Sequence, residues 1–255
     1  MYPFARKSMR FALLLFADAV LATANAAAQL PAHRDWFALP GNGTFSRAAQ
    51  NMCETVARTP PDLFIRSPNG KITVVTRATA EDAKTFAVDA AGRTFPITSE
   101  GWPCPEIGWS ASSDRFFVTY SDGGAIGSYH VAAYALANGK LTELPVAADV
   151  SRDFLTRYPK CFRPETPNVA GIAWSRDASR LLVAAEVLPH SNCDEMGTFR
   201  VYEVAVPGGK IVRRYSQIEA KKLFRRLLGP ELRNADDSCF SHPGACAIPM
   251  LHDAK

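Results

Sequence analysis

The chain has 255 residues, of which 47% are hydrophobic and 21% are charged, and its formal net charge is +4 at pH 7. This apolar content can fill a sizeable core and excludes a chain that is disordered throughout. The basic excess is small, so it indicates neither a nucleic-acid-binding protein nor one held at an anionic membrane surface.

The N-terminal segment has the order of a secretory signal peptide. Its basic start consists of Arg6, Lys7 and Arg10. An apolar run over residues 11–22, broken by Asp18, leads to Ala24-Asn25-Ala26, the small-x-small pattern that signal peptidase accepts. The run is shorter than the ~20 apolar residues that span a membrane, so we expect no integral membrane segment after cleavage. A buried N-terminal helix is the alternative. Export predicts a signal peptide over residues 1–26, a single domain over 27–255, and a periplasmic or secreted location.

All six cysteines follow this segment. They are Cys53, Cys104, Cys161, Cys193, Cys239 and Cys246. An even number of cysteines in an exported chain predicts disulfide bonds. Spacing does not select among the many pairings; pairing neighbours in chain order predicts the bonds Cys53–Cys104, Cys161–Cys193 and Cys239–Cys246.

The strongest internal signal is a repeated unit. Residues 107–118 and 172–183 align without a gap: in both, Trp-Ser leads into a polar turn, an arginine and a closing apolar triplet. The segments 127–141 and 197–211 also match each other, and a weaker third copy covers 67–95. Each copy predicts an apolar strand, a turn, a second short strand, and an alternating strand closed by a glycine turn. Roughly three to four antiparallel strands per unit is the content of a β-propeller blade.

These residues resemble a known family. The pattern that begins at Trp109-Ser110 and at Trp174-Ser175 is similar to the repeats of TolB-type β-propellers, and Ser67-Pro68-Asn69-Gly70-Lys71 differs at one position from their usual blade opening, Ser-Pro-Asp-Gly-Lys. The resemblance covers roughly residues 60–215. It implies an all-β fold of antiparallel propeller-like blades, and it says little about function, because such blades serve in many settings. Three legible units are fewer than the about four to eight blades of closed propellers, so we expect a small or incomplete propeller, with a β-sandwich as the alternative.

Two insertions and a helix complete the expected architecture. Residues 143–167 and 187–196 interrupt the repeats, and each contains one cysteine of the expected Cys161–Cys193 bond. Ser216-Gln217-Ile218-Glu219 is a capping box that predicts a short C-terminal helix, and Gly229-Pro230 predicts its end. The apolar residues near helical spacing are Ile218, Leu223, Phe224, Leu227 and Leu228. We expect this helix to pack on the rim of the β domain; a basic amphipathic helix at a membrane surface is the alternative.

Two polar clusters are candidate sites. His190, Asp194 and Glu195 lie in the second insertion, where binding residues often occur, although a solvated loop tied by a disulfide has the same composition. His242 and His252 lie near Cys239 and Cys246 and could bind zinc or copper, whereas in an oxidising compartment these thiols pair with each other instead.

The repeat argues against catalytic roles for its own residues. Ser110 resembles a nucleophile elbow but lacks the second glycine, and Ser175 occupies the same repeat position, so both are interpreted as turn residues. Trp109 and Trp174 are interpreted as blade core. We find no other catalytic or cofactor motif, and therefore expect no cofactor and a non-enzymatic exported binding or scaffold protein, whose ligand or protein partner the sequence does not identify. An extracytoplasmic hydrolase that uses the insertion-loop residues and a periplasmic metal-binding protein are the alternatives.

Overall fold

The computed structural model describes residues 35–55, 62–78, 83–97, 104–121, 123, 128–161, 166–191 and 193–237. All of them belong to the second of two units, Met1–Leu30 and Pro31–Lys255, into which the chain divides. The expected signal peptide over residues 1–26 lies outside the described residues.

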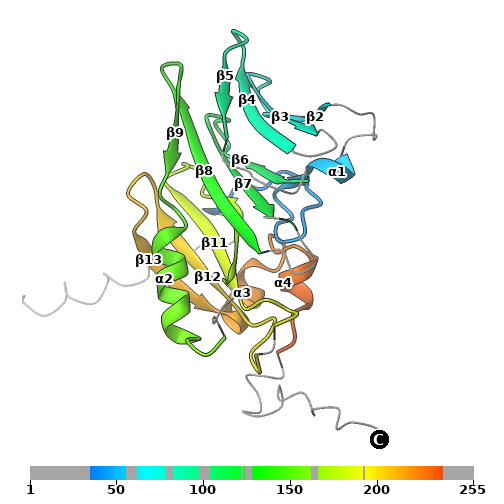
Figure 1. The fold of residues 1–255 in the computed structure, drawn as a ribbon. Helices are drawn as coiled ribbons and strands as arrows, with labels where there is room; N and C mark the ends of the chain where they lie inside the picture. Colours follow the sequence, from blue (N-terminus) through cyan, green and yellow to red (C-terminus); the bar gives the residue numbers. More distant parts are fainter. Residues whose placement is uncertain are drawn as a thin grey trace, which may run out of the picture. The chain divides into compact units, whose positions relative to one another are not determined.

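Within the described residues the strands form three antiparallel sheets (Figure 1). The first sheet contains β2 (Asp62–Arg66), β3 (Ile72–Ala78), β4 (Ala83–Asp89) and β5 (Thr94–Pro96). The second contains β6 (Glu106–Trp109), β7 (Arg115–Ser121), β8 (Tyr129–Ala137) and β9 (Lys140–Leu144), with the short β1 (Gln50–Asn51) added beside β6. The third contains β10 (Asn168–Trp174), β11 (Arg180–Glu186), β12 (Phe199–Ala205) and β13 (Ile211–Ser216). In each sheet these four strands pair in chain order, as a meander.

The same serine turn joins the first two of these four strands in every sheet. In the third sheet, the Ser175 N–H donates to the carbonyl of Arg180 at 2.9 Å, and the Arg180 N–H donates back to the Ser175 hydroxyl at 2.9 Å. Ser110 and Arg115 make the same two bonds in the second sheet, at 2.9 and 3.2 Å. The interpretation of Ser110 and Ser175 as turn residues is therefore confirmed.

The weak third copy folds in the same way. The Ser67 N–H donates to the carbonyl of Ile72 at 2.8 Å, and the Ile72 N–H donates to the Ser67 hydroxyl at 3.0 Å. Each turn also places its fourth residue at a positive φ of 56–70°, as glycine in the first sheet and as serine or alanine in the other two. These residues are Gly70, Ser113 and Ala178. One turn geometry thus occurs three times, although only one copy uses the glycine that favours it.

The two tryptophans of the repeat, Trp109 and Trp174, occupy equivalent positions in their sheets. Trp109 ends β6 and Trp174 ends β10, and their side chains are 3% and 0% exposed. Trp109 packs against Phe116 with ring centroids 5.1 Å apart, and the Trp174 Nε1–H donates to the carbonyl of Gly108 at 3.1 Å. Their interpretation as core residues is confirmed.

Three cores hold the sheets together. The first core lies between the first and second sheets and includes Ile65, Val74, Ile107 and Phe116. The second core lies between the second and third sheets and helix α2 (Ala148–Arg157), and includes Phe117, Val131, Trp174, Val183 and Phe154. The third core lies between the third sheet, the N-terminal segment and the C-terminal helices, and includes Trp36, Ile172, Leu182, Tyr215 and Phe224. Because side chains alternate along a strand, β7 sends Phe116 into the first core and Phe117 into the second.

The expected antiparallel β fold with a short helix near the C-terminus is confirmed, and within the described residues the three sheets do not close into a ring. Helix α3 (Gln217–Phe224) begins at the predicted capping box, in which Ser216 and Glu219 bond each other's backbone N–H. The predicted apolar face is partly wrong, because Ile218 and Leu223 are 54% and 37% exposed, while Ala220 and Phe224 are buried. The short helices α1 (Met52–Thr55) and α4 (Pro230–Asn234) and the longer α2, inside the first predicted insertion, were not predicted.

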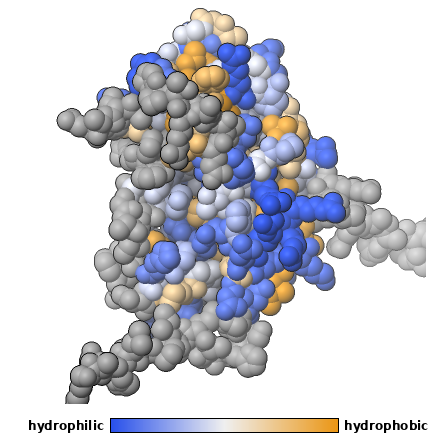
Figure 2. Space-filling model, turned by 90° about the vertical axis from the view of Figure 1, so that its right-hand side faces the viewer, coloured by the Kyte–Doolittle hydropathy of each residue, from blue (hydrophilic) through white to orange (hydrophobic). Residues whose placement is uncertain are grey.

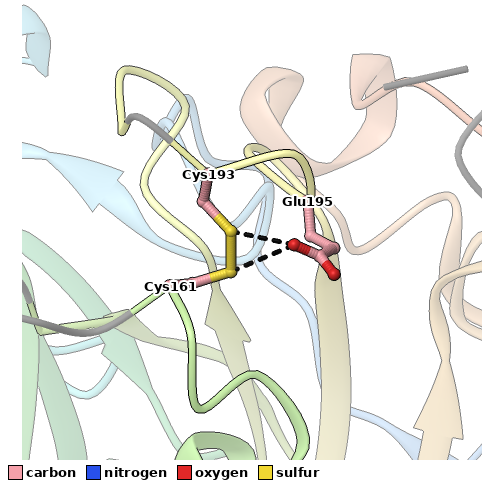
Figure 3. Close-up of side chains that lie close together, drawn as sticks. All are labelled: Cys161, Cys193 and Glu195. Atoms are coloured by element: carbon pink, nitrogen blue, oxygen red, sulfur yellow. Dashed lines mark hydrogen bonds between the residues drawn. A yellow bond between two sulfur atoms is a disulfide. The ribbon is translucent and has the colours of Figure 1, made fainter. Parts of the chain in front are cut away.

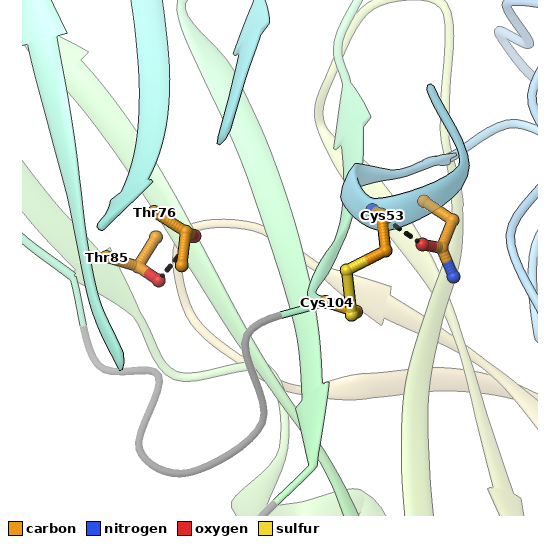
Figure 4. Close-up of a disulfide and its surroundings, with 5 residues drawn as sticks. Cys53, Thr76, Thr85 and Cys104 are labelled. Carbon is orange, nitrogen blue, oxygen red and sulfur yellow. Dashed lines mark hydrogen bonds between the residues drawn. A yellow bond between two sulfur atoms is a disulfide. The ribbon is translucent and has the colours of Figure 1, made fainter. Parts of the chain in front are cut away.

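Two disulfides tie distant segments together, and both expected pairings are confirmed. Cys53–Cys104 joins α1 to the residues just before β6 (Figure 4). The same view shows the hydrogen bond between the hydroxyl groups of Thr76 and Thr85, whose oxygens are 2.8 Å apart. Cys161–Cys193 joins the loop after α2 to the loop after β11. The expected Cys239–Cys246 bond lies outside the described residues. Disulfides of this kind are typical of proteins that mature in oxidising compartments. None of the helices in the described part of the chain is long and apolar enough to cross a membrane.

Candidate functional site

An acidic pocket of about 370 Å³ lies at one end of the third sheet. Three segments line it: the loop at Thr44, the end of β11 with the loop that follows, and α4 with the residues after it. Three carboxylic acids from two of these segments reach the pocket wall, Glu186, Glu231 and Asp236. The described lining residues include no lysine, arginine or histidine, so the pocket carries negative charge that no basic lining side chain offsets.

Glu186 is the most buried of the three acids. It is the last residue of β11, and its side chain is 1% exposed. The Asn168 Nδ2 group donates to its Oε2 at 2.9 Å, whereas its Oε1 is buried without a hydrogen-bond partner among the described residues. Burial raises the pKa of Glu186 to about 8; the Asn168 hydrogen bond opposes this rise, and the nearby charge of Glu231 adds to it. The carboxyl group is therefore largely protonated at neutral pH.

Asn168 holds this glutamate in place. It stands opposite Glu186 in the β10–β11 pairing, and its Oδ1 accepts the backbone N–H of Tyr129 at 3.0 Å. Tyr129 begins β8 and packs edge-on against Phe45 at 4.8 Å. One side chain therefore connects the second sheet, the third sheet and the pocket.

A second buried glutamate fixes the loop at Thr44. Glu106 begins β6 and is 2% exposed, and its carboxylate accepts the backbone N–H groups of Thr44 and, at 3.4 Å, of Phe45. Burial raises the pKa of Glu106 to about 7, although these hydrogen bonds oppose the rise. The carbonyl of Thr44 in turn accepts the N–H of Glu231 at 3.1 Å. The loop thus links the start of β6 to the start of α4 and positions two of the pocket walls.

Tyr129 lies close enough to Glu106, Glu231 and Glu186 for their charges to affect its pKa. Burial raises its pKa, and the charges of Glu106, Glu231 and Glu186 raise it further. A phenol in such surroundings keeps its proton and serves as a hydrogen-bond donor.

The predicted site residues lie on the same loop but outside the pocket lining. The loop between β11 and β12 contributes Pro189, Met196 and Gly197 to the pocket, while His190 and Asp194 are exposed to solvent. Glu195 is also exposed, and its carboxylate contacts the Cys161–Cys193 disulfide. His242, His252, Cys239 and Cys246 lie outside the described residues.

Sequence reasoning missed the acids of the pocket. Glu186 follows the apolar strand residues 181–185, and Glu231 follows Gly229-Pro230, a signal that was used only to end the preceding helix. A glutamate at the end of a run of apolar strand residues was the one available signal, because charged residues are rarely buried without a partner.

Figure 2 shows hydrophobic residues scattered among hydrophilic ones on the visible face, outside the grey atoms. Among the described residues the large exposed hydrophobic side chains are Phe64, Leu155, Val212, Ile218 and Leu223. They come from four different elements, β2, α2, β13 and α3.

Comparisons with known proteins add no assignment to this geometry. No protein-family model matches the chain, and a search of curated proteins gives no match either. The function proposed below therefore depends on the residues of this chain.

Proposed function

We propose that this protein is a periplasmic or secreted, non-enzymatic binding protein, built from TolB-like β-propeller repeats. Two disulfides support export. Three four-stranded meanders that share one serine turn support the propeller-like repeat. An incomplete propeller of this kind is a scaffold that presents loops at the ends of its sheets, and the acidic pocket lies at such an end.

The ligand of the pocket is a cationic group, an ammonium or guanidinium on a side chain of a partner protein. The observation that carries this proposal is Glu186, whose Oε1 is buried without a hydrogen-bond partner at a pocket that Glu231 and Asp236 also line. A buried carboxylate oxygen without a partner costs free energy, so Glu186 keeps its proton until a cationic donor from the ligand replaces it. A cation would also lower the pKa of Glu186, since a nearby positive charge favours the carboxylate.

The size of the pocket and the separation of its carboxylates favour an organic cation over a bare metal ion. Its volume of about 370 Å³ is within the range of small-ligand pockets, roughly 300–1,000 Å³. Among the described residues, the side-chain atoms that lie within 4.8 Å of one another and could bind a metal ion belong to Cys161, Cys193 and Glu195. None of these three residues lines the pocket. An extended cation with several N–H donors can bridge carboxylates that stand too far apart to share one ion.

Binding of side-chain analogues tests the proposal. We expect N-acetyl-lysinamide or N-acetyl-argininamide to bind saturably in a calorimetric or NMR titration, and the neutral N-acetyl-norleucinamide not to bind. Glu186→Gln keeps the shape and an acceptor for Asn168, and it should weaken binding about tenfold or more, because hydrogen bonds to charged groups are worth ~1.5–3 kcal/mol. Affinity should rise as pH increases through about 8, where Glu186 loses its proton.

The matched control is Glu143→Gln, an exposed glutamate of β9 that should leave the affinity unchanged. Equal binding by wild type and the Glu186→Gln variant, or equal binding of the neutral analogue, would contradict the cation site.

A further inference from the structure

The Cys161–Cys193 disulfide has a carboxylate directly beside it. The Oε2 atom of Glu195 lies 2.9 Å from the Sγ of Cys193 and 3.3 Å from the Sγ of Cys161, and it faces both sulfur atoms (Figure 3). Cys161 is 6% exposed and belongs to the second core, whereas Cys193 is partly exposed and Glu195 is exposed. One sulfur is thus anchored in the fold and the other is open to a reductant.

This carboxylate suits the reduced cysteines better than the disulfide. A disulfide sulfur has no proton to donate, so Glu195 gains no hydrogen bond from it. After reduction each sulfur is a thiol that can donate to Oε2, or a thiolate that can bind a metal ion beside the carboxylate oxygen. Glu195 therefore favours the dithiol form of this pair over its oxidised form.

We propose that Cys161, Cys193 and Glu195 form a binding site for a thiophilic divalent cation, Zn²⁺, once a dithiol reductant has opened their disulfide. The reductant transfers two electrons and two protons: its two S–H bonds are replaced by its own disulfide, and the protein gains two thiols. The thiols then release their two protons to solvent as both sulfurs bind the ion. Glu195 supplies an oxygen ligand, and water takes the fourth position.

The positions of the three ligand atoms fit such a site. All of them lie within 4.8 Å of one another, and the two Cα atoms are 5.2 Å apart. With Zn–S bonds of ~2.3 Å, a tetrahedral ion holds two sulfurs ~3.8 Å apart, so side-chain rotation alone can bring both sulfurs to the ion. The Cys53–Cys104 disulfide has no comparable group around it among the described residues.

Backbone hydrogen bonds keep the ligands in place when the disulfide opens. The Cys161 N–H donates to the carbonyl of Tyr158 at 3.0 Å, at the end of α2. On the other side, the Met196 N–H donates to the carbonyl of Cys193 at 3.1 Å, and the Thr198 N–H donates to the carbonyl of Glu195 at 3.0 Å. The loop after α2 and the loop after β11 are therefore held by hydrogen bonds that do not depend on the S–S bond.

Cobalt binding to the mature protein tests the proposal. The protein is reduced with tris(2-carboxyethyl)phosphine, whose phosphorus is oxidised with an oxygen atom from water, and Co²⁺ is then added as the spectroscopic probe. We expect a thiolate-to-cobalt charge-transfer absorption that saturates with Co²⁺, disappears when Zn²⁺ is added, and is absent in the oxidised protein. A signal of equal strength in the oxidised protein would overturn the proposal.

Four variants assign the signal to these residues. Cys161→Ser with Cys193→Ser should abolish it, whereas Cys53→Ser with Cys104→Ser and Cys239→Ser with Cys246→Ser should each retain it. Glu195→Gln replaces an exposed side chain and should leave the fold intact, so it keeps the test decisive if the cysteine variants do not fold. We expect it to weaken Co²⁺ affinity about tenfold or more. Unchanged affinity in that variant, or an unchanged signal without Cys161 and Cys193, would refute the site.

Discussion

At the scale of single residues, Glu106 and Glu186 determine how the fold responds to pH. Burial raises their pKa values to about 7 and about 8, from an ordinary value of 4.5. Between pH 4.5 and 8 the folded protein therefore holds protons that the unfolded chain has released. Stability from these groups is fully present below the ordinary pKa and is lost as pH rises through the raised values.

We expect the free energy of unfolding to be highest at mildly acidic pH and to fall between about pH 5 and pH 8, by an amount on the order of 6 kcal/mol for the two groups together. Urea unfolding at several pH values measures this change. Glu186→Gln cannot titrate, so it should flatten the part of the curve nearest pH 8. Stability that is constant or increases over this range would show that the two carboxyl groups titrate normally.

The serines and the glutamates differ in how well the sequence predicts them. Ser110 and Ser175 bond residues five positions away, and the repeat shows their role within a short window. Glu186 contacts Asn168, 18 residues away, and lies at a pocket with Thr44 and Glu231. Segments that only the tertiary fold brings together leave no local pattern, so the pocket could not be predicted from spacing.

At the scale of elements, the serine turn is the recurring unit that starts each meander. The Ser175 hydroxyl accepts the N–H of Arg180 and donates to the Asp177 carboxylate at 2.6 Å, and the serine is 1% exposed. The hydrogen bond from the Ser175 hydroxyl, with the backbone and hydroxyl bonds from Ser179, lowers the pKa of Asp177 to about 2. The turn is thus held by a buried hydroxyl whose loss leaves a backbone N–H without its acceptor.

Ser175→Ala should lower the free energy of unfolding by about 1–2 kcal/mol, the cost of an unsatisfied buried donor. Ser151→Ala, within α2, is the matched control, because alanine favours helix and should cost nothing. Urea unfolding of both variants at one pH gives the comparison. A Ser175→Ala variant as stable as wild type would mean that the hydroxyl is dispensable to the turn.

Helix α3 shows both the reach and the limit of local patterns. Its capping box consists of neighbours in sequence, so Ser216 and Glu219 were sufficient to place its start. Its buried face depends on partners from elsewhere: Phe224 packs edge-on against Tyr215 at 4.9 Å and against Trp36 at 6.2 Å. The position of the third sheet therefore decides which apolar residues of the helix are buried, and Ile218 is left exposed.

At the scale of the whole molecule, the second and third sheets are joined through Phe117. Its ring lies in the second core, and Gly108 and Gly171 provide the space for it, one from each sheet. Two hydrogen bonds cross the same boundary: the Gly171 N–H donates to the Thr119 hydroxyl, and the Trp174 Nε1–H donates to the Gly108 carbonyl, both at 3.1 Å. The repeat predicted the strands of each sheet, but Phe117 and Gly108 correspond to Leu182 and Ala173 in the other copy, so the repeat does not predict this packing.

We expect Gly171→Ala to destabilise the protein by about 1–3 kcal/mol, the usual cost of overpacking a core. A Cβ atom at this position would lie 2.4 Å from the Cδ2 atom of Phe117, so the ring must move. Gly208→Ala is the control, since its added Cβ meets nothing within 4 Å, and it should be nearly neutral. Urea unfolding measures all variants.

A second substitution shows whether the Phe117 ring is the cause. Phe117→Leu alone leaves a gap in the second core and lowers stability, but it also removes the ring atoms that the new methyl group would strike. The Gly171→Ala and Phe117→Leu double variant should therefore lose less stability than the sum of the losses in the two single variants, by at least ~0.5 kcal/mol. Fully additive losses would place the strain outside this contact, and the second and third sheets would then be coupled mainly by the two hydrogen bonds.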